Sequence, residues 1–127
     1  MKKEIIMTGS APAAIGPYSQ AIRIGHFLFQ SGQIGLDPAT GKIVEGGIDA
    51  QVEQVLQNVK AILTAAGADI SNVVKTTLFL TSIDDFARVN EIYGRHFNAE
   101  PPARSTVEVS RLPKEARFMM ESMAFIS

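Results

Sequence analysis

The sequence predicts an α+β fold in which one mixed β-sheet carries two helices on one of its faces. Two segments show the apolar spacing of amphipathic helices, and a single strand-like run separates them. Three strand-like segments precede the first helix and two follow the second, which gives the order β-β-β-α-β-α-β-β. A chain of 127 residues has the usual length of one domain, so we expect a single domain over residues 1–127.

The N-terminal third predicts short strands separated by loops rich in glycine, proline and small residues. The loops are expected at 8–20 and 32–42, and an ordered loop as long as the first is often functional. Gly25 and His26 suit a type II′ hairpin turn in which His26 is exposed. The strands themselves are expected within 1–7, at Ala21–Ile24 and at Phe27–Ser31.

Both helices have recognisable boundaries. Apolar residues recur at helical spacing from Asp49 to Ala66, where Asp49 can cap the start and Gly67 can close the end. Ser82 is the expected cap of the second helix, and Asp85 completes a weak capping box. The second helix has an apolar stripe made of Phe86, Val89, Tyr93 and Phe97. We interpret Tyr93 and His96 as packing and rim residues rather than catalysts.

The remaining strands lie at Val73–Leu80, Pro101–Val109 and Arg117–Ile126. The first of these is rich in β-branched and aromatic residues, which indicates a central strand. We expect the last two strands to pair as a hairpin through a turn at 111–115. Because two helices cover only one face of the sheet, apolar side chains on the other face should be exposed and should favour self-association.

Composition excludes several kinds of chemistry. The chain has no cysteine and only two histidines, His26 and His96, so we expect no thiol chemistry, no metal site and no disulfide. A formal net charge of -1 gives no electrostatic reason to expect nucleic-acid binding, and the glycines match no phosphate-binding pattern. No apolar stretch approaches the roughly 20 residues of a membrane helix. We therefore expect a cytoplasmic protein without a membrane partner.

Arg104 is the first candidate functional residue. It follows Pro101 and Pro102, which suit a strand entrance, and it shares one face of the predicted strand with Thr106 and Glu108. A guanidinium fixed in this way can hold a carboxylate by two hydrogen bonds. The simpler interpretation is an arginine paired with a neighbouring acid.

Glu121 is the second candidate, because it interrupts the apolar run of the last strand. A carboxylate inside such a strand is costly unless it is paired or takes part in chemistry. In the predicted hairpin, Arg104 and Glu121 lie within about one residue of register. An ordinary Arg104–Glu121 ion pair and a functional pair are both consistent with this arrangement.

Several motifs along the chain resemble the RidA family, the reactive intermediate deaminases also called YjgF. They occur in the same order from end to end, and the strongest is Pro102-Ala103-Arg104-Ser105-Thr106-Val107-Glu108-Val109 with Leu112-Pro113-Lys114. The others are 11–20 (APAAIGPYSQ), 31–34 (SGQI), 58–67 and 74–77 (VKTT).

The resemblance implies a chorismate-mutase-like fold and a homotrimer whose sheets line a central barrel, with ligand sites in the clefts between subunits. It implies the activity of a 2-iminobutanoate/2-iminopropanoate deaminase. Such an enzyme hydrolyses reactive enamines and imines, including 2-aminoacrylate from pyridoxal-phosphate-dependent dehydratases, to 2-oxo acids and ammonia. It needs no cofactor.

The resemblance also implies roles for individual residues. Arg104 holds the substrate carboxylate, and Glu121 positions or activates water. Tyr18 takes part in catalysis and lines the pocket with Ser31 and Gly32. The cysteine that many members carry two residues after the arginine is Thr106 here, which preserves a backbone contact to substrate but removes thiol-dependent regulation. Arg104 is expected to need a neighbouring chain to act.

Two other functions remain open at this stage. A non-catalytic module could bind 2-oxo acids in the same cleft and signal through the contacts between subunits. RNA cleavage or inhibition of translation, activities sometimes attributed to the family, would need a basic patch and the aromatic strand signatures of RNA-binding domains. The sequence has neither feature.

Overall fold

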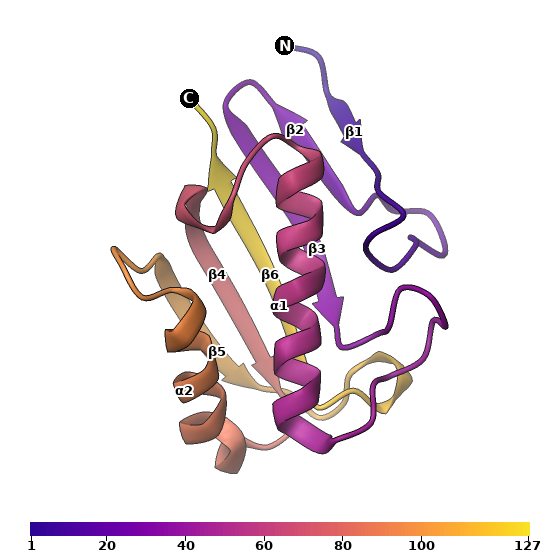
Figure 1. Ribbon diagram of the computed structural model, residues 1–127, viewed down its shortest axis with the longest axis vertical. Coiled ribbons are helices and arrows are strands. Elements are labelled where there is room, and N and C mark those ends of the chain that lie inside the picture. Colours follow the sequence, from indigo (N-terminus) through magenta and orange to yellow (C-terminus); the bar gives the residue numbers. More distant parts are fainter.

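One six-stranded mixed sheet organises the computed structural model, which describes residues 1–127 (Figure 1). The strand order across the sheet is β1-β2-β3-β6-β4-β5, and only the β4–β5 pair is parallel. The predicted element order is confirmed. The elements are β1 (Glu4–Ile6), β2 (Ala21–Ile24), β3 (Phe27–Ile34), α1 (Gly47–Ala65), β4 (Val73–Leu80), α2 (Phe86–His96), β5 (Ala103–Glu108) and β6 (Phe118–Phe125).

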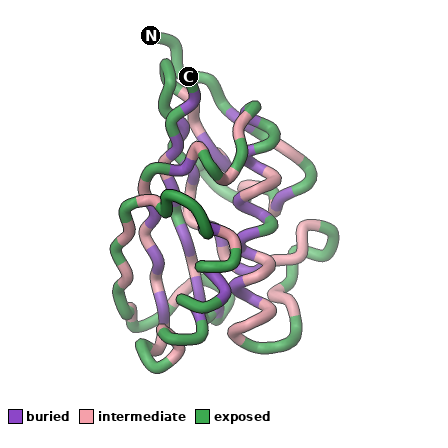
Figure 2. The backbone as a smooth tube through the Cα atoms, turned by 60° about the vertical axis from the view of Figure 1, so that its left-hand side comes forward, coloured by how far each residue is buried: buried purple, intermediate pink, exposed green.

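Both helices lie on the same face of the sheet, as the sequence predicts (Figure 1). The apolar stripe of α1 is completely buried, and buried residues concentrate in the strands and helices while the loops are exposed (Figure 2). The largest side chains of this single core are Leu56, Ile62 and Leu63 from α1 and Leu28, Leu78, Leu80, Phe118 and Met120 from the sheet.

The start of α1 differs from the prediction. The helix begins at Gly47 and its N-cap is Gly46, which has a φ of 116° and offers no side-chain cap. Gly47 also has a positive φ, of 74°, so the two glycines let the chain turn into the helix without the help of Asp49. Gly67 closes the end of the helix with a φ of 78°, as predicted.

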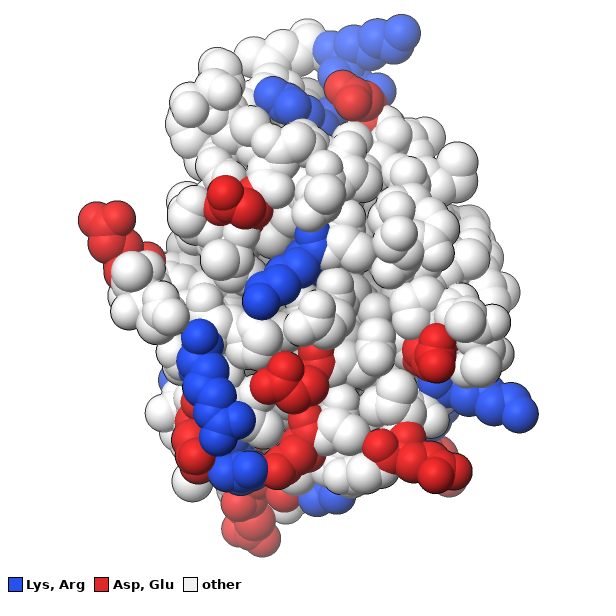
Figure 3. All heavy atoms as spheres, in the orientation of Figure 1, with Lys and Arg blue, Asp and Glu red and all other residues white.

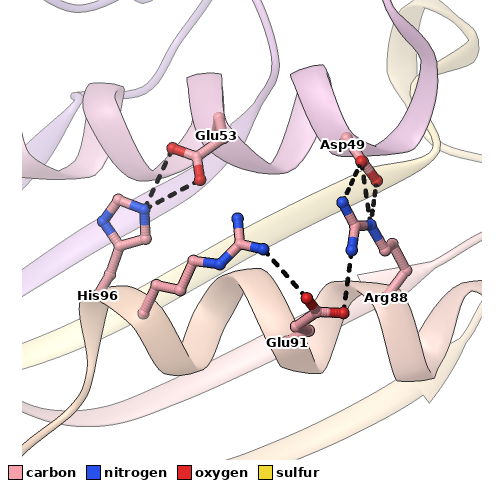
Figure 4. A network of polar contacts seen from close by, with 6 residues as sticks. Asp49, Glu53, Arg88, Glu91 and His96 are labelled. Atoms are coloured by element: carbon pink, nitrogen blue, oxygen red, sulfur yellow. Dashed lines mark hydrogen bonds and ion pairs between the residues drawn. The ribbon is translucent and has the colours of Figure 1, made fainter.

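Asp49 instead joins the two helices through ion pairs on their outer surface (Figure 4). Its carboxylate lies 2.7 Å from the Arg88 guanidinium, and Arg88 also contacts Glu91 at 2.9 Å. The hydrogen bonds from Arg88 hold the pKa of Asp49 below its ordinary value. These groups are about half exposed, so each pair contributes little to stability.

Strand β3 extends three residues beyond Ser31, into the segment 32–34 that the sequence assigns to a loop. Its pairing with β6 shifts register between Gln30 and Gln33, which is a β-bulge. The bulge places Ser31 and Gly32 within an irregular part of a paired strand. Glycine and glutamine have low strand propensity, so their pattern alone indicates a loop.

The predicted β5–β6 hairpin is wrong. Strand β6 inserts between β3 and β4, and β5 pairs in parallel with the other side of β4. The alternation in β6 places Phe118, Met120 and Ala124 in the core, which suits a central strand. Strand β5 carries polar residues on both faces, which suits the sheet edge that it occupies.

The face of the sheet opposite the helices carries exposed aromatic side chains. Phe27 and Phe29 are each 42% exposed and Phe125 is 41% exposed, and the rings of Phe27 and Phe125 pack edge to face at 5.4 Å. We call this surface the open face. The predicted uncovered apolar surface is therefore present. No helix combines the length and the apolar character that crossing a membrane requires.

The close packing at Gly35 gives a stability prediction. A Cβ atom at residue 35 would lie 2.9 Å from the Cα of Gln51, so Gly35→Ala should destabilise the fold by about 1–3 kcal/mol. Gly94→Ala is the matched control, since nothing lies within 4 Å of its Cβ position and alanine is the better helix former by roughly 0.5–1 kcal/mol. Urea denaturation at one fixed protein concentration measures both variants. Equal stability of the two would contradict this account of Gly35.

Candidate active site

Three of the predicted site residues line one cavity of about 520 Å³ beside the β3 bulge. Tyr18 enters it from the loop before β2, and Ser31 and Gly32 come from the bulge itself. The cavity is also lined by Met119, and a Cβ on residue 32 would lie 2.7 Å from the Met119 sulfur. A larger residue at position 32 would therefore require the Met119 side chain to move.

The polar groups of this cavity are held by the backbone of the 8–20 loop. The Ser31 hydroxyl donates to the Ser19 carbonyl at 2.6 Å, and the Ser31 N–H donates to the Gln20 carbonyl at 3.0 Å. The Tyr18 hydroxyl accepts from the Ile15 N–H at 3.4 Å while its side chain remains 53% exposed. The Ser31 oxygen can still accept a hydrogen bond from a ligand, and the Tyr18 hydroxyl can donate one.

Gln20 holds the loop in place, and sequence reasoning missed it. Its side chain is buried, accepts from the Thr8 N–H at 2.8 Å and donates to the Thr8 and Pro12 carbonyls at 3.1 and 2.8 Å. A buried primary amide can satisfy several backbone groups of a loop that lacks regular structure. The signal available in the sequence is a glutamine placed directly before an apolar strand.

Glu121 lies on the open face, in a separate hollow of about 280 Å³ that it shares with Lys75 and Thr77. It is exposed and forms no hydrogen bond or ion pair within the chain. The expected cost of a carboxylate in an apolar strand is avoided because the apolar residues of β6 alternate between the two faces, and Glu121 points away from the core. A third hollow, lined by Tyr18, Phe29, Gln30 and Ser31, adjoins both sites.

Arg104 lies on the opposite, helix-bearing face. It is paired in register with Thr76, whereas Glu121 is paired with the next residue, Thr77. The predicted register between β5 and β6 does not exist, because β4 separates the two strands, and adjacent β4 residues point to opposite faces. The predicted Arg104–Glu121 ion pair is therefore absent from a single chain.

The contacts of Arg104 are with neutral groups. Its Nη1 donates to the Asn90 side-chain oxygen at 2.7 Å, and the guanidinium carbon lies 4.9 Å from the Tyr93 ring centre and 5.5 Å from that of Phe86. The arginines at 88, 95 and 117 each contact a carboxylate, whereas Arg104, like Arg23 and Arg111, forms no ion pair. The positive charge of Arg104 is not balanced by an acidic group within the chain, which is the state expected of an anion-binding arginine.

Two further predicted residues lie beside Arg104. Tyr93 is buried and its hydroxyl is 2.8 Å from the Thr76 hydroxyl, so it is a packing residue as predicted. Burial raises the pKa of the Tyr93 phenol, which keeps it uncharged at neutral pH. Thr106 follows on the same face of β5, and its hydroxyl oxygen is buried without a hydrogen-bond partner.

Comparison with known proteins identifies the family. The family model described as Endoribonuclease L-PSP matches residues 8–126. Reactive Intermediate Deaminase A from Arabidopsis thaliana is 52% identical over 98% of this chain and 66% of its own length. The chain belongs to the RidA family. Human 2-iminobutanoate/2-iminopropanoate deaminase, another relative of this RidA-family chain, is 48% identical over 96% of the chain and 89% of its own length.

A solved structure has the same fold. The crystal structure of E. coli TdcF with bound serine superposes with a TM-score of 0.94, at 43% identity, and covers 98% of this chain and 99% of that one. The six-stranded sheet with two helices is therefore the RidA-family fold, as the sequence motifs predict.

The role of Gln20 can be tested by amide hydrogen exchange. Gln20→Ala removes the acceptor of the Thr8 N–H and the donor to the Thr8, Ala11 and Pro12 carbonyls, so the amides of residues 8–19 should exchange faster. The loss of these buried hydrogen bonds should also lower the free energy of unfolding by about 1–3 kcal/mol. Gln57→Ala, an exposed change on α1, is the control and should leave the loop protected. Unchanged exchange in Gln20→Ala would show that the loop is held by other contacts.

Proposed function

We propose that this protein is a 2-imino acid deaminase that acts on 2-iminobutanoate and 2-iminopropanoate. The latter is the imine form of 2-aminoacrylate, which pyridoxal-phosphate-dependent dehydratases release. The observation that carries the proposal is the 48% identity, over 96% of the chain, to the human protein named for this activity. The unbalanced charge of Arg104 and the cavities lined by Glu121, Tyr18 and Ser31 give the chemistry a physical basis.

The proposed reaction needs an anion clamp, a positioned water and a group that moves protons. Arg104 binds the substrate carboxylate. Glu121 accepts a proton from water as the water oxygen attacks the imine carbon, and the resulting carbinolamine loses ammonia after its nitrogen is protonated. The C–N bond breaks, a C=O bond forms, and water supplies the oxygen. No electrons are gained or lost, so no redox cofactor is required.

The cavity residues have supporting roles in this proposal. The hydroxyls of Tyr18 and Ser31 and the backbone N–H of Gly32 orient the imine and the attacking water, and the backbone of Thr106 contacts the substrate. Imines hydrolyse slowly without a catalyst, so even modest proton transfer and orientation give useful acceleration. The bound serine in E. coli TdcF, itself a small amino acid with a carboxylate, supports a ligand of this size and charge.

The site is proposed to form between the subunits of a homotrimer. Arg104 and Glu121 lie on opposite faces of the same sheet, so one chain does not bring them together. Arg104 belongs to the edge strand β5, where a neighbouring chain can approach, and Glu121 belongs to the open face, whose exposed aromatic residues favour association. A neighbour's open face can then present Glu121 to the Arg104 side chain.

The charge distribution and the histidines favour this function over RNA cleavage. Acidic and basic side chains are mixed over the helix-bearing face rather than gathered into a basic patch (Figure 3). His96 lies between Lys60 at 2.8 Å and Glu53 at 3.2 Å, and His26 contacts the Ile126 carbonyl at 2.8 Å. Neither histidine lines the cavities that contain Tyr18 or Glu121.

The two catalytic roles can be tested in a coupled assay in which a dehydratase makes 2-aminoacrylate from serine. Arg104→Ala should abolish the acceleration of ammonia release, and Glu121→Ala should reduce it by about 10²-fold or more with the fold intact. Arg111→Ala is the charge control, because Arg111 is exposed and forms no ion pair. Full activity in a correctly assembled Arg104→Ala protein would refute the proposal. Binding of 2-oxobutanoate without any acceleration by the unmodified protein would favour a sensing module.

Assembly can be measured by size-exclusion chromatography with light scattering. We expect a trimer at micromolar concentration, because association covers the aromatic residues of the open face. Phe29→Glu should shift the protein towards monomer, since a charge at the centre of a covered apolar surface is strongly unfavourable. A monomer in the unmodified protein would contradict the proposed assembly.

The shared site gives a sharper prediction for mixed oligomers. Arg104→Ala and Glu121→Ala subunits, unfolded together and refolded, should regain activity, because about one interface in four then combines an intact arginine with an intact glutamate from the neighbour. The two variants refolded separately provide the baseline. If each site lies within a single chain, mixing restores nothing.

A further inference from the structure

Three side chains of helix α2 pack against the Arg104 guanidinium. Phe86, Asn90 and Tyr93 are spaced at i, i+4 and i+7, so they project from one face of the helix. The two rings lie 5.5 and 4.9 Å from the guanidinium carbon, and the Asn90 oxygen is 2.7 Å from Nη1. Together they fix both the plane of the guanidinium and its rotation within that plane.

These contacts use only one of the three guanidinium nitrogens. Nη1 is engaged by Asn90, while Nε and Nη2 have no hydrogen-bond partner in the chain. Nε and Nη2 lie side by side and form an edge that can donate two parallel hydrogen bonds to one carboxylate. The arrangement therefore leaves one bidentate edge of Arg104 open to a ligand.

We infer that Phe86, Asn90 and Tyr93 are positioning residues, and that they orient Arg104 so that the substrate carboxylate binds its Nε–Nη2 edge. This inference rests on the proposed function, in which Arg104 is the carboxylate clamp. It adds that the Nε and Nη2 atoms of Arg104 bind the carboxylate. It also adds that residues of α2 determine how the guanidinium faces the substrate.

The support beneath the guanidinium is rigid. The Tyr93 ring stacks on Phe97 at 4.4 Å, and its hydroxyl is 2.8 Å from that of Thr76. Thr76 is completely buried and is the β4 residue in register with Arg104. The Tyr93 ring is thus tied by one hydrogen bond to β4, the strand that pairs with β5 at the position of Arg104. Little movement of the guanidinium plane is available in this arrangement.

Substitutions on α2 should change substrate binding in a defined order. Tyr93→Phe keeps the ring face but removes the hydrogen bond to Thr76, so it should raise KM less than Tyr93→Leu does. Tyr93→Leu removes the cation–π contact and should raise KM by roughly 3- to 30-fold, with a smaller effect on kcat. Asn90→Asp should be more harmful than Asn90→Ala, because a carboxylate at position 90 would compete with the substrate for the guanidinium.

The edge itself can be observed by ¹⁵N NMR of the arginine Nε–H groups with 2-oxobutanoate as the probe. The Arg104 signal is assigned by its loss in Arg104→Lys, and calorimetry measures binding independently. We expect the Arg104 Nε–H proton to move downfield on saturation in the unmodified protein and in Tyr93→Phe. Binding without this shift, or an unchanged KM in a folded and assembled Tyr93→Leu enzyme, would overturn the inference while leaving the deaminase function intact. No binding and no accelerated imine hydrolysis would reject the proposed function and the inference together.

Discussion

The alternation of side chains along β4 is the constraint on which the candidate site depends. Thr76 points into the core and Thr77 points to the open face, and the neighbouring strands follow the same alternation. Arg104 and Glu121 are paired with these two adjacent residues, so a difference of one position puts the guanidinium and the carboxylate on opposite sides of the sheet. Each residue is thereby kept from neutralising the other within the chain.

Neutral contacts around Arg104 preserve its capacity to bind an anion. A buried ion pair would have satisfied the guanidinium but would also have competed with any ligand carboxylate. Asn90 and the rings of Phe86 and Tyr93 orient the group while leaving its charge uncompensated. Most ion pairs of this protein instead join side chains of the two helices, as Asp49 and Arg88 do on the exposed surface, where an unpaired charge would cost little in any case.

The sequence predicts the individual strands, helices and turns well, but it predicts poorly which strands pair with one another. The order of the strands and helices, the face of β5 that carries Arg104 and Thr106, and the glycine turn at Gly25 all follow from patterns within a few residues. The pairing of β6 with β3 and β4 does not, because a short connection after β5 fits a hairpin equally well. The central position of β6 becomes evident only in the folded structure, where β6 pairs with β3 on one side and β4 on the other and buries alternate residues in the core.

The candidate site shows the same limit. Arg104, Glu121, Tyr18 and Ser31 stand out in the sequence by position or by family motif, whereas Gln20 does not, since its importance lies in backbone groups of a loop that has no periodic pattern. The functional pairing of Arg104 with Glu121 could be suspected from register, but the sequence does not reveal that the two occupy opposite faces. That requires knowing that β4 lies between them.

In the proposed assembly, the burial of apolar surface that would hold the subunits together would also complete the active site. In a single chain, the open face exposes the rings of Phe27, Phe29 and Phe125 to water, and the carboxylate of Glu121 lines a hollow with Phe29 and has no hydrogen-bond partner. Covering this face with a neighbour removes apolar surface from water and brings an edge strand close to Glu121. In the proposed assembly, exclusion of water would strengthen the electrostatic interactions of both Arg104 and Glu121, so the two residues would act together only between neighbouring chains. Substrate that binds across such an interface would in turn stabilise it, by the linkage between ligand binding and association.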